Sequence, residues 1–175
     1  MKQQRPQTKG GPDAVEMLDQ DHHQVEAMFE KFESAGERQK ADLAEQIFHE
    51  LEIHSTLEEE IFYPALRDQV GGEALAKASP DDSKDESAAE KGEDLIEIFY
   101  EEHKAVKESI EELRGLEIGD EQYDELFQQL KDDVLSHASD EEETVFPVAK
   151  EKLDTRALGA RMQKRKDELL GAAAK

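Results

Sequence analysis

Six residues of types that bind transition metals stand at matched places in the two halves of this 175-residue chain. Each half contains one histidine, followed further on by a histidine and a glutamate in the pattern H-x-x-x-E. Imidazole and carboxylate together suit iron, manganese or zinc. The sequence therefore predicts a metal site. Its candidate ligands are His22, His54, Glu58, His103, His137 and Glu141.

The spacing of these residues shows that one pattern occurs twice. DHHQVEAMFEKFE at 21–33 corresponds to EHKAVKESIEEL at 102–113, and HSTLEEEIFYP at 54–64 corresponds to HASDEEETVFP at 137–147. The first pair is offset by 81 positions and the second by 83, a difference that a two-residue change in a loop explains. We expect two helix–turn–helix halves joined by a linker.

Apolar residues recur at steps of three and four in each of the four segments that carry a candidate histidine. Such steps hold side chains on one stripe of a helix, so we predict an all-α fold, an antiparallel four-helix bundle of two helix–turn–helix repeats. The predicted parts are a flexible N-terminus at 1–11, a bundle at 12–152 with a crossover linker at 70–92, and a basic C-terminal segment at 153–175 that forms a short helix.

Capping residues and prolines suggest where the helices end. Asp13 and Asp120 are placed to cap the first and fourth helices. Pro64 and Pro147 each fall ten residues after a candidate histidine. Because proline removes a backbone donor and clashes one turn back, each is expected to kink or end its helix.

The six candidate ligands fall on the apolar stripes, one histidine on each helix. A buried carboxylate costs several kcal/mol unless it is paired or bound to a metal. Residues four apart share a helix face, so each H-x-x-x-E pair is a ready chelate. A single core histidine is more often an ordinary hydrogen-bonded group. Four of them, duplicated and two with glutamate at i+4, favour a metal centre.

The neighbouring polar residues receive separate predictions. His23 and His49 lie off the stripes and should face solvent or a helix flank. Glu59 and Glu142 should be mostly on the surface, although their spacing lets them reach a metal. Tyr63 is a candidate for a hydrogen bond at the site.

The order H…H-x-x-x-E…H…H-x-x-x-E, with DHHQV near the start and EEEIFYP after the second histidine, resembles the hemerythrin-like family, the HHE cation-binding domains, over residues 12–152. The resemblance implies a four-helix bundle with a non-haem centre of two iron ions. The i+4 glutamates would bridge both ions beside an oxo or hydroxo group. Carried over by motif, it implies three ligands from each half: His22, His54 and Glu58, then His103, His137 and Glu141.

One departure bears on function. Oxygen-carrying hemerythrins have a fifth histidine in an H-x-x-x-H pair, and here His103 is followed by Lys107. The resemblance then implies reaction with, or sensing of, oxygen, peroxide or nitric oxide in an iron or redox stress role. The alternatives are a catalase-like or iron-oxidising enzyme, and a zinc- or manganese-binding bundle that acts as an interaction or sensor module.

Composition limits the partners. The chain has 45 acidic and 22 basic residues, a net charge of −23, which repels phosphate backbones, so no nucleic-acid partner is expected. No apolar run approaches the roughly 18 residues of a membrane span, and there are no cysteines. We expect a cytoplasmic monomer. The basic segment, with Arg161, Lys164, Arg165 and Lys166, either lies against the bundle's own acidic surface or binds a protein partner.

Overall fold

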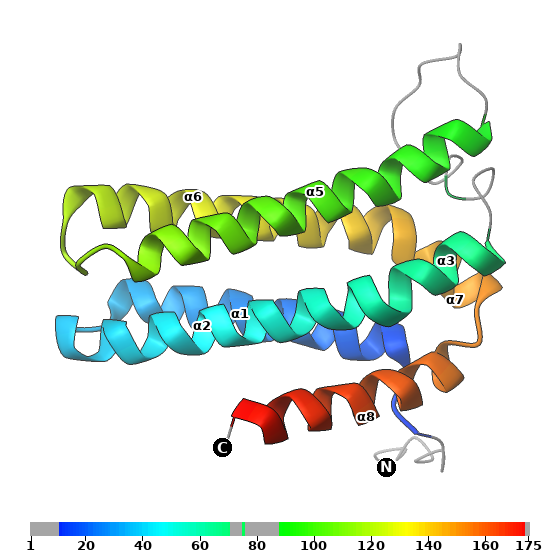
Figure 1. Ribbon diagram of the computed structural model, residues 1–175, viewed down its shortest axis with the longest axis horizontal. Coiled ribbons are helices and arrows are strands. Elements are labelled where there is room, and N and C mark those ends of the chain that lie inside the picture. The colour runs from blue at the N-terminus through cyan, green and yellow to red at the C-terminus, as the bar shows by residue number, and fades with distance from the viewer. Residues whose placement is uncertain (1–10, 71–74, 76–87, 174–175) are drawn as a thin grey trace, which may run out of the picture.

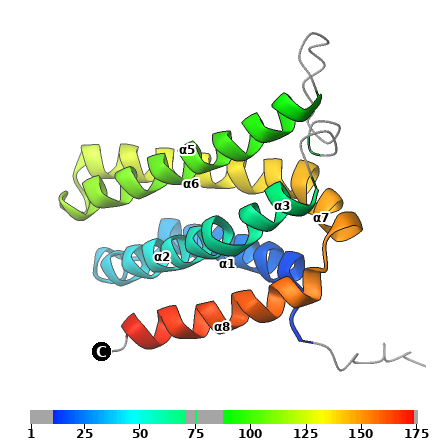
Figure 2. The same cartoon turned by 45° about the vertical axis from the view of Figure 1, so that its right-hand side comes forward.

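The computed structural model describes residues 11–70, 75 and 88–173. Two antiparallel helix pairs face each other, α1 with α2 and α5 with α6, and α8 runs along the outside of the first pair (Figures 1 and 2). The predicted all-α bundle with a C-terminal helix is confirmed. The elements are α1 (Ala14–Ser34), α2 (Glu37–Leu57), η1 (Glu58–Phe62), α3 (Tyr63–Gln69), α5 (Ala88–Arg114), α6 (Glu121–Asp140), η2 (Glu141–Val145), α7 (Phe146–Lys152) and α8 (Thr155–Ala173).

The boundaries of these helices follow local chemistry. Asp13 caps α1 as predicted, since its side chain accepts hydrogen bonds from the backbone N–H groups of Val15 and Glu16. Asp120 occupies the N-cap position of α6, but its side chain makes no capping hydrogen bond. The turn before it is made by Gly119, whose φ of 98° lies in the left-handed region that favours glycine.

Neither proline ends its helix, so that part of the prediction is wrong. Helical structure continues past Pro64 to Gln69 and past Pro147 to Lys152. Each proline follows a five-residue π-helical segment, η1 or η2. The wider turn starts a new α-helical segment in which proline stands near the first position, where its missing N–H is tolerated.

The bundle core consists of two apolar clusters. Leu18, Leu57 and Phe99 belong to the one beside α8, whereas Phe29 and Ile110 belong to the one toward the opposite end of the helices. On each long helix of the bundle, the candidate histidine lies between residues of the two clusters. The apolar packing therefore holds the four histidines at a level between two dry layers.

Helix α8 packs against α1, α2 and η1. Leu158 and Met162 are buried in this contact. Gly159 is required because a Cβ there would lie 1.9 Å from the carbonyl oxygen of Pro12. Arg165 donates to Glu60 at 2.7 Å and 3.0 Å. The basic segment thus lies against the acidic surface of its own bundle, the first of the two predicted alternatives.

Some predicted boundaries fall outside the described residues. These include the N-terminal residues 1–10 and, within the predicted linker, residues 71–74 and 76–87. Helix α5 begins at Ala88, inside the range predicted for the linker. None of the described helices combines the length and apolar character needed to cross a bilayer.

Truncation after Asp154 should lower the melting temperature by about 6–24 °C. Burial of Leu158 and Met162 contributes about 1.5–3 kcal/mol each, and in a chain of this size 1 kcal/mol corresponds to about 2–4 °C. Thermal unfolding followed by circular dichroism measures the change. A chain ending at Leu170, which is exposed, is the control. An unchanged melting temperature after the longer truncation would show that α8 does not stabilise the bundle.

Candidate metal centre

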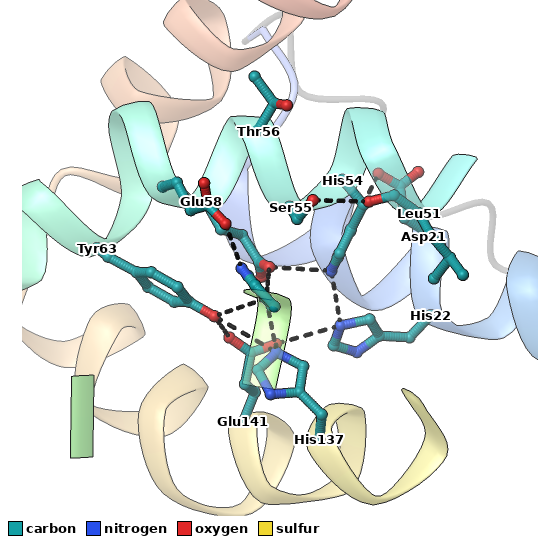
Figure 3. Close-up of polar contacts among 12 residues, drawn as sticks. Asp21, His22, Leu51, His54, Ser55, Thr56, Glu58, Tyr63, His137 and Glu141 are labelled. Carbon is teal, nitrogen blue, oxygen red and sulfur yellow. Dashed lines mark hydrogen bonds and ion pairs between the residues drawn. The ribbon is translucent and has the colours of Figure 1, made fainter. Parts of the chain in front are cut away.

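Four helices each bring one imidazole to the centre of the bundle. His22 comes from α1, His54 from α2, His103 from α5 and His137 from α6, and all four side chains are at least nine-tenths buried. Figure 3 shows His22, His54 and His137 pointing toward one another. The residue pattern that marks them in the sequence therefore corresponds to one cluster in space.

The imidazoles form two pairs. Nε2 of His22 lies 3.1 Å from Nε2 of His54, and Nε2 of His103 lies 3.0 Å from Nε2 of His137. The two histidines of each half of the chain thus converge on one point. Because Nε2 carries the lone pair that binds a metal, each pair can serve one ion.

The two glutamates lie between the histidine pairs. Oε2 of Glu58 is 3.2 Å from Nε2 of His54 and 3.3 Å from that of His103. Oε2 of Glu141 is 3.3 Å from Nε2 of His22 and 3.5 Å from that of His137. Each carboxylate therefore contacts one histidine of each pair, which is the arrangement that a carboxylate shared by two ions requires.

Burial of these carboxylates is the strongest sign of a ligand. Glu58 and Glu141 are completely buried. Both oxygens of Glu58, and Oε2 of Glu141, have no hydrogen-bond partner. An ionised carboxylate without partners in a dry core costs several kcal/mol, and a bound cation removes that cost. The residues present fit a metal centre.

The backbone at both glutamates is unusual in the same way. Each π-helical segment begins at the glutamate, so that the N–H of Tyr63 bonds the carbonyl of Glu58 and the N–H of Phe146 bonds the carbonyl of Glu141. Single π turns inside α-helices occur frequently at functional sites. In both halves the π turn begins at the glutamate that stands four residues after the histidine.

A second set of carboxylates faces the outer nitrogen, Nδ1, of every histidine. Such contacts hold Nδ1 as the protonated nitrogen and leave Nε2 free for a metal. The four pairs are Glu142 with His22 at 2.9 Å, Asp21 with His54 at 3.6 Å, Glu59 with His103 at 3.0 Å and Glu102 with His137 at 2.6 Å. The contact with Asp21 is an ion-pair distance, longer than a hydrogen bond.

Sequence reasoning missed part of this outer set. Asp21 and Glu102 were not identified, although an acidic residue directly precedes both His22 and His103. Glu59 and Glu142, predicted as mostly surface residues, instead hold histidines of the opposite half of the chain. The acidic residues do recur in both halves of the sequence. However, each carboxylate contacts a histidine on a different helix, so spacing along the chain does not show which histidine it contacts.

Two lysines complete the network. Lys107 donates to both oxygens of Glu59, at 2.7 Å and 2.8 Å. Lys166 of α8 donates to Oδ1 of Asp21 at 2.8 Å. Lys107, at the position of the missing fifth histidine, therefore orients an outer carboxylate. Helix α8 contributes the lysine that holds another of these carboxylates.

Tyr63 makes the hydrogen bond predicted for it. Its hydroxyl donates to Oε1 of Glu141 at 2.6 Å and lies 3.4 Å from Nε2 of both His103 and His137. Burial, with the charge of Glu141, raises the pKa of Tyr63 well above its usual value, so the hydroxyl keeps its proton. The matching residue of the second half is Phe146, which stacks on His22.

Without a metal, protons on the imidazoles balance the buried negative charge. Burial by itself would lower the pKa of His54 and of His103. The charge of Glu58, together with Asp21, raises the pKa of His54 to about 10. Its contacts with the carboxylates of Glu58 and Glu59 raise the pKa of His103 to about 9. Burial opposes ionisation of Glu58, but these two histidines hold its pKa well below the usual value.

The other histidines lie outside this cluster, as predicted. His23 is exposed and contacts the backbone carbonyl of Asp19 at 2.7 Å through Nδ1. His49 belongs to none of the groups of side chains close enough to share an ion among the described residues.

Comparison with known proteins adds three findings. The profile of the Hemerythrin HHE cation binding domain family matches residues 13–88 and 94–175. A solved hemerythrin HHE cation binding domain-containing protein from Mycobacterium kansasii has a similar fold, with a TM-score of 0.70, 22% identity and coverage of 93% of this chain and 90% of that one. A protein named DNA nickase from Nostoc sp. is 23% identical over 141 residues. That match covers 80% of this chain but 34% of the Nostoc protein, so the chain spans about a third of its length.

Glu102→Gln should weaken metal binding about 10- to 100-fold, because loss of an outer partner of a ligating histidine typically has this effect. Glu101→Gln removes the same charge from the adjacent, exposed position on α5 and is the matched control. Competition with a chelator measures both affinities. Equal affinities for the two variants would show that the contact between Glu102 and His137 does not support the centre.

The metal-free protein should lose stability as pH rises from about 6.5 to about 10. Unfolded histidine titrates near pH 6.5, whereas His54 and His103 stay protonated in the folded protein up to about 10 and 9. Their contribution is therefore complete below pH 6.5 and is lost through those folded pKa values. Urea unfolding in the presence of a chelator measures it, and stability that does not vary over this range would contradict the prediction.

Proposed function

The chain belongs to the hemerythrin HHE cation-binding family, and we propose that its bundle holds a non-haem centre of two iron ions that reacts with or senses oxygen, peroxide or nitric oxide. One observation carries the proposal: two completely buried carboxylates, of whose four oxygens only Oε1 of Glu141 has a hydrogen bond, lie between two converging pairs of imidazoles. This arrangement supports two adjacent ions that share the carboxylates.

The roles of the residues follow from the pairing. His22 and His54 would hold one ion, and His103 and His137 the other, with Glu58 and Glu141 between them. When bound, iron ions in such a site supply Lewis-acid and redox chemistry toward a small ligand. The outer carboxylates keep each imidazole oriented, and an apolar cluster lies on either side of the centre.

The donor set supports iron. Mixed imidazole and carboxylate ligands with open positions favour iron, and manganese and zinc accept the same donors.

A small cavity beside the histidines supports a small ligand. Its volume of about 30 Å³ is the space of roughly one water molecule. Most of the lining residues other than the histidines are apolar, which favours an uncharged molecule such as oxygen or nitric oxide. The apolar residues that line the cavity include Val25, Leu51, Val106 and Val134.

A catalase-like reaction is the second candidate, favoured by the position of Tyr63. Its hydroxyl is a buried hydrogen-bond donor within 3.4 Å of Nε2 of two histidines. Oxygen release measured on the iron-loaded protein separates the candidates. Sustained release from excess peroxide favours an enzyme, and a single stoichiometric reaction favours a sensor.

Nicking of DNA is not proposed for this chain. That activity is named for a relative about three times as long, and a net charge of −23 opposes approach to a phosphate backbone. The cytoplasmic location, the monomeric state and a protein partner for the C-terminal segment stay predictions.

Protein produced in iron-rich medium should contain about two iron ions per chain and show a charge-transfer absorption band, because the site offers ligands for two ions. Elemental analysis measures the content. Glu58→Ala should reduce it to less than half, since both positions lose a shared ligand, while Glu60→Ala on the same turn should retain it. An iron-free wild-type protein after such growth would refute the proposal, and manganese or zinc in its place would correct the metal.

A further inference from the structure

A second group of metal-binding side chains lies on the surface beside the buried centre. Asp19 and His23 of α1 and Glu142 of η2 each offer a ligand atom, and these atoms lie within 4.8 Å of one another. The group combines one imidazole with two carboxylates, a donor set suited to divalent transition metals. Nδ1 of His23 contacts the backbone carbonyl of Asp19 at 2.7 Å, so Nε2 is left free to bind.

Two members of this group, His23 and Glu142, line a pocket that reaches one ligand of the centre. The pocket has a volume of about 170 Å³, and its lining includes His23, Glu26 and Glu142 together with the buried ligand His22. Glu142 also contacts Nδ1 of His22 at 2.9 Å. One carboxylate therefore belongs both to the surface group and to the shell around the buried site.

The repeat provides an internal comparison, because the matching group on the other side of the bundle has lysines at the positions that correspond to His23 and Glu26. Glu59 corresponds to Glu142, and its carboxylate is occupied by Lys107 at 2.7 Å and 2.8 Å. The position that corresponds to Lys107 in the first half is Glu26. On the side of Glu142, an acidic residue thus takes the place of the lysine that binds Glu59.

The other two positions of the surface group also lack an acidic residue or a histidine in the second half. His23 corresponds to Lys104, and Asp19 corresponds to Tyr100, whose hydroxyl donates to the backbone carbonyl of Glu59. Among the described residues, neither Lys nor Arg forms an ion pair with Asp19, Glu26 or Glu142. The centre is therefore approached by an acidic, hollowed side and by a side that carries two lysines.

We propose that Asp19, His23 and Glu142 form a surface site for a divalent metal cation and that cations pass from it to the buried centre. The proposal rests on the function proposed above, because it assumes a centre that takes up metal. A local negative field raises the concentration of cations at the pocket and the rate of their uptake. Glu142 then lies between the surface ion and the shell of His22.

Counting bound Mn²⁺ by the loss of the free-ion signal in electron paramagnetic resonance tests the site. The double variant Asp19→Asn/His23→Gln should bind one ion fewer per chain than the wild type. The difference can be measured whether or not the buried centre binds Mn²⁺. If the centre binds two ions, the wild type binds three and the variant two; if the centre stays empty, the wild type binds one and the variant none. Failure of the proposed di-iron function is therefore distinguishable from failure of the surface site.

The rate of uptake tests the role of the site as an entrance. Co²⁺ added to metal-free protein should enter the buried centre about tenfold more slowly in the double variant, with the same final absorbance. Glu30→Gln, the same loss of charge farther along α1, and Lys104→Gln, the counterpart of His23, should load at the wild-type rate. An equal number of Mn²⁺ ions in the double variant would overturn the site. Loss of one ion with an unchanged Co²⁺ rate would overturn its role in uptake.

Discussion

Two buried carboxylates with three oxygens that lack hydrogen bonds are the constraint on which this structure depends. Glu58 and Glu141 are completely buried at the middle of the bundle, where an uncompensated charge is among the most costly features a fold can contain. Positive charge must therefore be present near them, as protons on the histidines or as metal ions. Because the same groups bind either, metal binding and protonation compete for one site, and folding is linked to both.

The residues around these carboxylates form shells of alternating charge. Imidazoles surround the carboxylates, acidic side chains face the outer nitrogens of the imidazoles, and lysines hold two of those acids. One of the lysines, Lys166, comes from the helix added outside the bundle. The strongly acidic composition of the chain is thus partly explained by its metal site, since each histidine requires a carboxylate of its own.

The repeat makes the centre nearly symmetric, and the departures from symmetry are where the two sides of the site differ. Tyr63 is matched by Phe146, so one histidine pair has a hydroxyl beside it and the other has an apolar ring. Lys107 is matched by Glu26, so one side has a lysine–glutamate ion pair and the other has a pocket lined by acidic residues. The repeat accounts for the shared ligands, and the positions at which the halves differ make the two sides of the site unequal.

Periodicity and repetition determined the helices, the pairing of the halves and the six inner residues, because ligands at i and i+4 share a face whatever the tertiary arrangement. The sequence alone also placed the cap at Asp13 and singled out Tyr63. The tertiary structure decided which carboxylate meets which histidine: Glu59 and Glu142 cross to the opposite half, and Asp21 is held by Lys166 from α8. It also decided that Pro64 and Pro147 follow π turns instead of ending their helices. These features depend on contacts between residues far apart in the chain, and local spacing carries no information about such contacts.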